Sequence, residues 1–324
     1  MPDAAHVARA REACRAALED GGPLQPLWRA WRAGAPGLVK ASAVLPRVSA
    51  HGRAIPRLTG LKQALERRGL PVAGGAFERF LVVNAAAGAI PRLEGLAIDE
   101  RVKQLFLHNF EMYAAGTTPE PFDLSRASFV AAARVATLSR FPAGQLDWEV
   151  SGVPRSWLLR ARWHAWPRLA AALFDFGGMA PAFFSHLNPN RRNQGMLLER
   201  ESLRSYHRMA RSMERQPSIR GLITASWFHS PDTFVVSPHL KWLNDVFLEN
   251  GGYVVPLGPV DAHKSGALHR SPERERAYEA GTFVPAEALV IWPRAAMLAW
   301  AHGHQELRDE AARRSRLTPH GARA

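Results

Sequence analysis

Cysteine is almost absent from this chain of 324 residues, whose only thiol is that of Cys14. No internal disulfide and no cysteine-based zinc site can form, so the fold must rest on its own core. Cys14 lies in an alanine-rich stretch that predicts a helix over residues 4–19. We therefore expect it to be a small buried side chain rather than a nucleophile.

Long apolar runs are also absent. The most apolar stretches are residues 169–184, which Asp175 interrupts, and residues 289–301, which Pro293 interrupts. Both are shorter than the ~20 apolar residues that a bilayer requires. Charged side chains also interrupt the N-terminus where the apolar part of a signal peptide would lie. We expect a cytoplasmic protein with no membrane span.

Acidic residues are outnumbered, because 29 Asp and Glu face 42 Lys and Arg, which leaves a net charge of +13. Such an excess attracts nucleic acid, anionic lipid, an acidic protein or a phosphorylated cofactor. The arginines are nevertheless spread along the whole chain, without a run of about five or six like charges that would mark a binding arm. Much of the excess is therefore a property of an arginine-rich composition.

The common catalytic and metal-binding motifs are missing. The chain has no His-Glu-x-x-His, no Gly-x-Ser-x-Gly and no Walker loop, so zinc protease, esterase and P-loop functions have no support. His302 and His304 are separated by one glycine but have no third ligand at a suitable spacing. We expect no metal cofactor.

Helix and strand signals predict an α/β fold of the α+β kind, in three parts. Residues 1–150 form a mostly helical region of unknown function, with a short strand at 80–83. Residues 151–305 form a mixed sheet flanked by helices, because helical and strand patterns alternate there. Residues 306–324 are a charged, weakly patterned tail, a composition typical of mobile termini.

The last third of the chain gives the clearest pattern. Its expected elements are a helix at 196–215, strands at 219–228 and 233–236, a helix begun by Ser237-Pro238 and ended by Gly251-Gly252, a strand at 253–257, a helix from Ser271 to Gly281, a strand at 289–292 and a helix at 295–301.

The turn at residues 236–240 is the best local candidate for a site. A strand that runs directly into a capped helix leaves free N–H groups at the positive end of the helix dipole, which favours anions. Ser237 or His239 would then contact a phosphate or a carboxylate. The alternative is an ordinary capped helix, since no glycine-rich loop accompanies the turn.

A stripe of arginines follows one face of the helix predicted at 196–215, roughly opposite its apolar face. Like charges at this spacing repel one another weakly, so the stripe needs acidic neighbours or a bound anion. It is either a solvated surface or a docking site for an acidic partner protein, a phosphorylated cofactor or nucleic acid. The members of the stripe are Arg200, Arg204, Arg208, Arg211 and Arg215.

Residues 276–283 read Arg-Ala-Tyr-Glu-Ala-Gly-Thr-Phe. They look like the Tyr-Glu-Lys-x-Gly-Phe sequence of the GNAT family of N-acyltransferases, and residues 219–292 resemble the second half of that fold. That half runs strand, pyrophosphate loop, helix, strand, short helix, strand. The family's Arg/Gln-x-x-Gly-x-Gly loop is not found, and residues 236–240 occupy its place.

The resemblance implies that the protein moves an acyl group from a coenzyme A or carrier-protein thioester to an amine of a small or carrier-bound substrate. Ser237, His239 and Leu240 would hold the pyrophosphate. Tyr278 would protonate the departing sulfur, and His229, or a water near Asp232, would accept the proton of the amine.

Two other functions remain open. One is a basic binding protein without catalysis, which docks nucleic acid or an acidic partner through the arginine stripe. The other is a different biosynthetic transferase or lyase on a GNAT-like frame that has lost its cofactor loop. The substrate and the oligomeric state are not determined by these patterns.

Overall fold

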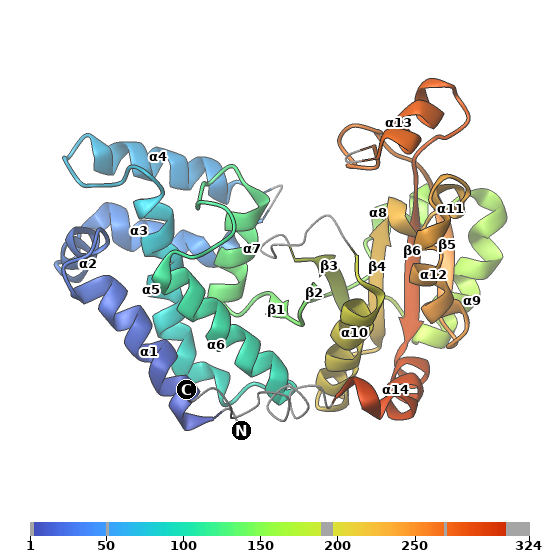
Figure 1. Ribbon diagram of the computed structural model, residues 1–324, viewed down its shortest axis with the longest axis horizontal. Helices are drawn as coiled ribbons and strands as arrows, with labels where there is room; N and C mark the ends of the chain where they lie inside the picture. Colours follow the sequence, from blue (N-terminus) through green and yellow to red (C-terminus); the bar gives the residue numbers. More distant parts are fainter. Residues whose placement is uncertain (1–2, 50–51, 189–196, 269–270, 309–324) are drawn as a thin grey trace, which may run out of the picture. The chain divides into compact units, whose positions relative to one another are not determined.

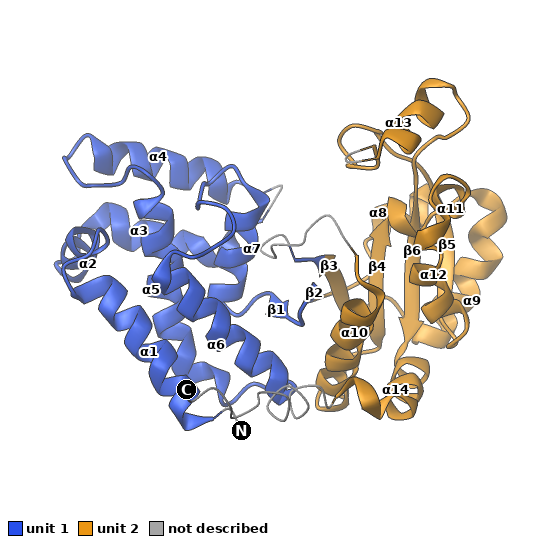
Figure 2. Ribbon diagram, viewed as in Figure 1, with its two compact units in different colours: residues 1–149, 187–196 blue, residues 150–186, 197–324 orange. Residues whose placement is uncertain are grey.

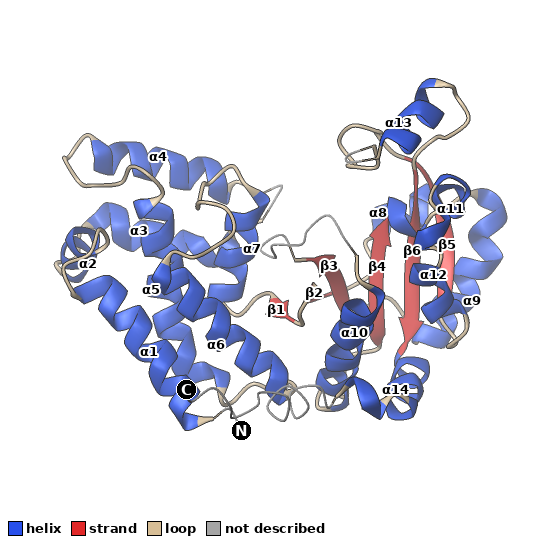
Figure 3. Cartoon of the chain, in the orientation of Figure 1, coloured by secondary structure: helices blue, strands red, loops and turns tan. Residues whose placement is uncertain are grey.

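The computed structural model describes residues 3–49, 52–188, 197–268 and 271–308, and Figure 1 colours them along the chain. The chain divides into two compact units (Figure 2): residues 1–149 with 187–196, and residues 150–186 with 197–324. Helices dominate the first unit, and the second combines a mixed sheet with helices (Figure 3). The predicted α/β class, with a helical N-terminal region and a C-terminal mixed sheet, is confirmed.

The first unit is built around α5 (Ala76–Leu93), which α1, α6 and α7 contact. Residues 80–83 are all buried in this helix, so the short strand predicted there is wrong. Burial on every side removed the helical periodicity that would have identified it. The other elements are α1 (Ala4–Glu19), α2 (Gln25–Arg32), α3 (Pro36–Val44), η1 (Leu45–Arg47), α4 (Ala54–Glu66), α6 (Glu100–Ala115), α7 (Ala127–Ala136) and the antiparallel β1 (Phe141–Pro142) and β2 (Leu146–Ser151).

Cys14 lies on the inner side of α1 and is fully buried. Burial raises the pKa of its thiol to about 12, and the nearby carboxylate of Glu111 acts in the same direction. The thiol therefore stays protonated at neutral pH, as expected for a packing residue.

The second unit contains four strands in the order β3-β4-β6-β5. β3 runs parallel to β4, β4 is antiparallel to β6, and β6 is antiparallel to β5. The strands predicted around 219–228, 253–257 and 289–292 are confirmed. Their bounds are β3 (Ala182–Leu187), β4 (Gly221–Ser226), β5 (Tyr253–Pro259) and β6 (Ala286–Pro293).

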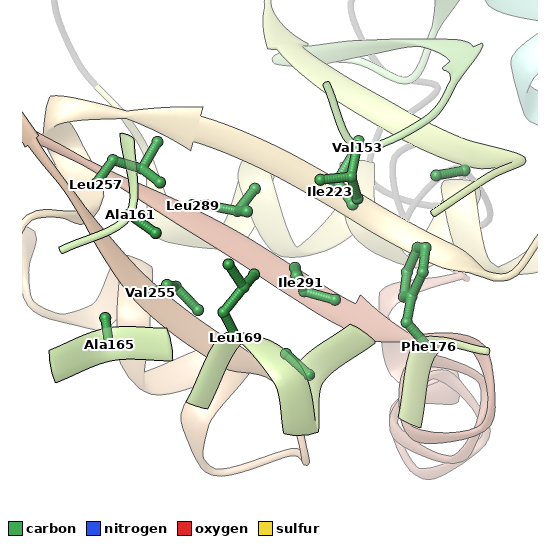
Figure 4. Packing of buried hydrophobic residues seen from close by; sticks show 12 residues of the cluster. Val153, Ala161, Ala165, Leu169, Phe176, Ile223, Val255, Leu257, Leu289 and Ile291 are labelled. Carbon is green, nitrogen blue, oxygen red and sulfur yellow. The ribbon is translucent and has the colours of Figure 1, made fainter. Parts of the chain in front are cut away.

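The two faces of this sheet are covered differently. On one face, Ile223 and Ile291 join a buried aliphatic cluster with Leu169 and Phe176 of α9 (Figure 4). On the other face, the neighbouring Trp292 contacts aromatic rings of α10, α12 and α14. The alternation of Ile291 and Trp292 along β6 therefore gives one aliphatic and one aromatic layer.

Helices and turns connect these strands in the described part of the second unit. Residues 233–236, which were predicted as a strand, belong to the short helix α11, and Ser230-Pro231 begins it. Among the described helices, none is long and apolar enough to cross a membrane. The elements are α8 (Arg155–Arg160), η2 (Trp163–Ala165), α9 (Trp166–Phe176), α10 (Glu199–Glu214), η3 (Trp227–His229), α11 (Pro231–Val236), η4 (Pro238–Leu240), α12 (Trp242–Leu248), α13 (Pro272–Glu279), α14 (Arg294–Gly303) and η5 (Gln305–Leu307).

The tail predicted at 306–324 is described only at its start, because residues 309–324 lie outside the described residues. Residue 196, the predicted start of the helix that becomes α10, also lies outside them.

Candidate functional site

The two parallel strands of the second unit are joined at one end and separate at the other. At their starts, the backbone N–H of Arg220 donates to the carbonyl of Pro181 (2.9 Å), and its Nε donates to that of Ala180 (2.7 Å). The ladder then pairs Phe183 with Leu222 and Phe184 with Ile223. Beyond these pairs the described ladder ends, although each strand continues for further residues.

The second half of β4 remains paired with β6. Its ladder with β6 continues to the pair of Ser226 and Ala288. Thr224 Oγ1 donates to the carbonyl of Ser185 (3.3 Å), a side-chain bond at the point where the backbone ladder stops. Figure 1 shows β3 and β4 spreading apart towards their carboxyl ends, and we call this separation of the two strands the β3–β4 divergence. It is the kind of strand end at which open α/β sheets bind ligands.

Aromatic rings flank the divergence on the α9 side of the sheet. Phe184 and His186 lie two positions apart, on the same face of β3, and have ring centroids 4.2 Å apart. The ring of Trp157, from α8, meets Phe184 edge to face at 5.4 Å. Trp157 and Phe184 also pack against the aliphatic cluster beneath the sheet, so this group of rings is continuous with the core.

His229 lies directly after β4, at the end of η3, and is buried. Its Nδ1 lies 2.9 Å from Oδ1 of Asn244, on α12. The Nδ2 of Asn244 in turn donates to the backbone carbonyl of His229 (2.9 Å). The second bond fixes the orientation of the amide, so Oδ1 must accept and Nδ1 of His229 must carry the proton.

This bond leaves the other ring nitrogen of His229, Nε2, with its lone pair. Burial lowers the pKa of His229 to about 4, although the bond to Asn244 opposes the shift. The ring is therefore neutral at neutral pH, and its Nε2 is an acceptor nitrogen on the short helix η3 that follows β4. Of the catalytic residues predicted from sequence, His229 has the best defined geometry.

The geometry predicted for the turn at residues 236–240 is wrong, because a short helix rather than a strand precedes it. Ser237 N–H donates to the carbonyl of Thr233 (2.8 Å), Leu240 N–H to that of Ser237 (3.1 Å) and Lys241 N–H to that of Pro238 (3.1 Å). The helix that begins at Pro238 is only a three-residue 3₁₀ turn, and Ser237 does not cap it. The expected free N–H groups are thus largely used.

Two of the three side chains predicted to bind the pyrophosphate are buried among other residues of this corner. Ser237 is buried, and its hydroxyl accepts from Nη1 of Arg274 (3.1 Å). Nε of Arg274 donates to the carbonyl of Ala267 (2.5 Å), and its guanidinium lies 4.8 Å from the ring centre of Trp227. Leu240 packs in the same apolar cluster as Trp227, whereas His239 is exposed. The buried arginine Arg274 therefore contacts three segments of this corner.

The other two predicted catalytic residues take no part in the described hydrogen bonds between His229 and Asn244. Asp232 is exposed in the first turn of α11. Tyr278 lies on α13, in the connection between β5 and β6, and is 38% exposed. Its ring meets that of His263 at 6.1 Å. Neither residue has a described hydrogen bond to His229 or Asn244.

The arginine stripe is not a uniform surface. Arg204 is buried, and its Nη1 donates to Glu201 (2.5 Å). Arg211 forms an ion pair with Glu214 (2.5 Å). Arg208 is half-buried, and Arg200 and Arg215 are exposed. Acidic neighbours on the same helix therefore neutralise part of the stripe, which weakens its case as an anion dock.

The histidine pair near the C-terminus does not form a metal site in the described residues. His302 Nε2 lies 2.6 Å from Glu214, and His304 Nδ1 lies 2.8 Å from the carbonyl of Trp300. No cluster of three or more possible metal ligands occurs in the part of the chain that the structure describes.

Sequence reasoning overlooked β3 and the way it pairs. The strand reads Ala-Phe-Phe-Ser-His-Leu, and the apolar stretch before it obscured its start. A usable signal followed it, because Arg192-Asn193-Gln194-Gly195 matches the first half of an Arg/Gln-x-x-Gly-x-Gly loop. Those four residues lie outside the described part of the chain.

Comparisons of this chain with protein-family models, with curated proteins and with solved structures found no match.

Proposed function

We propose that the second unit transfers an acyl group from a thioester, carried by coenzyme A or by a carrier protein, to an amine. The observation that carries the proposal is the β3–β4 divergence. Two parallel strands that separate turn backbone N–H and C=O groups towards the space between them, and an extended ligand with amide groups satisfies such edges. The pantetheine arm of an acyl thioester is a ligand of this kind.

The order of elements supports the same proposal. In the GNAT family a strand, the pyrophosphate loop, a helix and a second strand follow one another. Here β3, residues 188–198, α10 and β4 follow in that order. This alignment moves the loop from residues 236–240 to the segment that contains Arg192 and Gly195. The lack of glycine at residues 236–240 then no longer counts against the resemblance, because those residues do not correspond to the loop.

The same alignment reassigns the family's short helix. The connection from the last residue of α12 to the first residue of β5 reads Leu248-Glu249-Asn250-Gly251-Gly252-Tyr253, which corresponds to Tyr-Glu-Lys-x-Gly-Phe. Leu248 then stands where the family has its tyrosine acid, and Tyr278 lies in a later connection. We therefore do not assign protonation of the sulfur to Tyr278.

The proposed reaction is direct transfer. The amine nitrogen attacks the thioester carbonyl carbon, the C–S bond breaks, and the sulfur leaves as a thiolate that takes a proton from water. N–H groups at the divergence polarise the carbonyl oxygen. The nitrogen loses a proton to water, which the neutral Nε2 of His229 orients by accepting its hydrogen bond. A nitrogen with a pKa of about 4 orients water better than it removes protons.

The alternative of a non-catalytic basic binding protein has less support, because Glu201 and Glu214 pair with two arginines of the stripe. A transferase or lyase that has lost its thioester site is the alternative that the following test addresses.

Acetyl-CoA should raise the melting temperature of the protein, because a ligand that binds only the folded state stabilises it by about 2.7 kcal/mol at about 100 times its Kd. Ala225→Phe places a ring on β4 beyond the last β3–β4 pair, at a half-buried position, and should abolish this rise. Ala286→Phe is the matched control, since Ala286 is also half-buried but lies on β6 opposite Pro259. No rise for the unmodified protein at saturating acetyl-CoA would refute the coenzyme A form of the proposal, and an acyl-carrier thioester is then the remaining donor to test.

A further inference from the structure

Large apolar side chains are exposed on the layer formed by α8, η2 and α9. The exposed fractions are 83% for Leu159, 84% for Trp163, 48% for Trp166 and 85% for Phe174. We call these four side chains the α8–α9 patch. Isolated exposed apolar residues are common, but a group of this size within one layer marks an interaction surface.

The patch lies on the outer side of this layer. Ala161, Ala165 and Leu169 are buried in the cluster that packs on the sheet, so the inner side of the layer is fixed (Figure 4). At 100° per residue, the positions of α9 opposite Leu169 and Phe176 carry no charge. These outer positions are Pro167, Ala170, Ala171 and Phe174, and all are exposed.

An outer helix face without charges is unusual for a helix that faces only water, because such helices normally carry polar residues there. The core does not require these residues, since α9 already buries Leu169, Ala172 and Phe176. The exposed apolar area of Trp163 and Phe174 therefore does not contribute to the core of this unit.

The charge around the patch is positive. Residues 154–178 contain four arginines, at 155, 160, 162 and 168, and one acid, Asp175. Arg160 pairs with Glu287 (2.9 Å), and Asp175 accepts a hydrogen bond from the hydroxyl of Tyr253. Within the described residues, no acidic side chain lies within ion-pair distance of Arg155, Arg162 or Arg168. A negatively charged surface would complement this rim.

We infer that the α8–α9 patch binds the surface of a bilayer that contains anionic lipid. Tryptophan and phenylalanine insert at the boundary between headgroups and acyl chains, and arginines beside them contact lipid phosphates. Single-stranded nucleic acid also binds aromatic and basic residues, but Leu159, Pro167 and the two outer alanines offer no ring on which a base stacks. The aliphatic part of the surface thus favours lipid over nucleic acid.

Co-sedimentation of the full chain with vesicles tests the inference. Vesicles of phosphatidylglycerol and phosphatidylcholine in equal parts should bind the protein, and vesicles of phosphatidylcholine alone should bind it much more weakly. Trp163→Ala and Phe174→Ala should each lower the partition coefficient roughly tenfold. Val235→Ala, at an 80% exposed position of α11, is the matched control and should have little effect.

The electrostatic part has its own matched pair. Arg162→Glu with Arg168→Glu should lower binding far more than Arg11→Glu with Arg67→Glu, because each arginine near an anionic surface contributes about fivefold. Both pairs change the net charge equally and replace exposed side chains. Unchanged melting temperatures would show that the variants fold.

The inference is overturned if the protein does not bind the mixed vesicles. It is also overturned if both arginine double variants lower vesicle binding equally, which would indicate nonspecific attraction. It is also overturned if Phe174→Ala converts a dimer into a monomer in sedimentation velocity, because the patch would then bind a second copy. Binding to an oligonucleotide that depends on Trp163, without binding to vesicles, would identify a nucleic-acid surface instead. None of these results depends on acyl transfer.

Discussion

Replacing His229 by asparagine should change how the stability of the second unit depends on pH. The side chain is buried, its Nδ1 donates to Asn244 (2.9 Å), and its pKa falls from 6.5 to about 4 because burial disfavours the charged ring. Asparagine cannot titrate, and its amide N–H can still donate to Asn244. The substitution therefore removes the proton linkage while it keeps the donor.

The direction of the effect follows from proton binding in the two states. In the unfolded chain His229 becomes protonated below about pH 6.5, whereas in the folded chain it becomes protonated only below about pH 4. Stability from this residue is complete above pH 6.5 and is lost as the pH falls towards 4. Each unit of difference between the two pKa values changes the free energy of unfolding by about 1.4 kcal/mol, so the total loss of stability reaches about 3 kcal/mol.

Urea unfolding at a series of pH values gives the comparison. Near neutral pH, His229→Asn should be less stable than the original protein by about 1–2 kcal/mol, because a smaller side chain packs less well. The difference should shrink as the pH falls and should vanish or reverse near the folded pKa of about 4.

The carboxylates titrate in both proteins, so their contribution cancels when the two free energies of unfolding are subtracted. His239→Asn, at an exposed position of the same unit, is the matched control for the change of residue type. Parallel stability curves for His229→Asn and the original protein would refute a buried neutral imidazole at this position.

Three further substitutions test the packing of both units. Arg274→Met should destabilise the second unit by about 3 kcal/mol, because the buried carbonyl of Ala267 loses its donor; an unchanged urea midpoint would show that the arginine does not hold this corner. Gly221→Ala should cost about 3 kcal/mol or more, because φ is +153° and a Cβ would collide with the carbonyl of Trp292 and the ring of Phe176. Gly60→Ala in α4, where a Cβ meets nothing within 4 Å, should instead stabilise the first unit by up to about 1 kcal/mol, and equal effects at the two glycines would contradict the geometry.

Local patterns predicted the elements that are amphipathic or clearly bounded. α10 followed from the recurrence of Tyr206, Ala210 and Met213, which are all buried. α13 followed from Ser271, whose hydroxyl does accept from the N–H of Arg274 (3.3 Å). In such segments a single chemical requirement decides the structure, and neighbouring residues satisfy it.

The failures arose where distant residues decide the outcome. Thr233 to Val236 has the composition of a strand, but Ser230-Pro231 starts a helix and places Thr233 Oγ1 on the carbonyl of Trp227 (2.7 Å). The corner at Ser237 is closed by Arg274, 37 positions later in the chain. The β3–β4 divergence depends on the register of two strands separated by α10, and a sequence pattern does not contain that register.

Hydrogen–deuterium exchange with and without acetyl-CoA tests the proposed thioester site most directly. Ligand bound at the β3–β4 divergence should slow amide exchange in residues 184–187 and 223–227, while exchange in α13 (Pro272–Glu279) stays unchanged. Protection confined to α13 and the corner at residues 236–240 would contradict the proposed site, and no protection at saturating acetyl-CoA would contradict the coenzyme A form of the proposal.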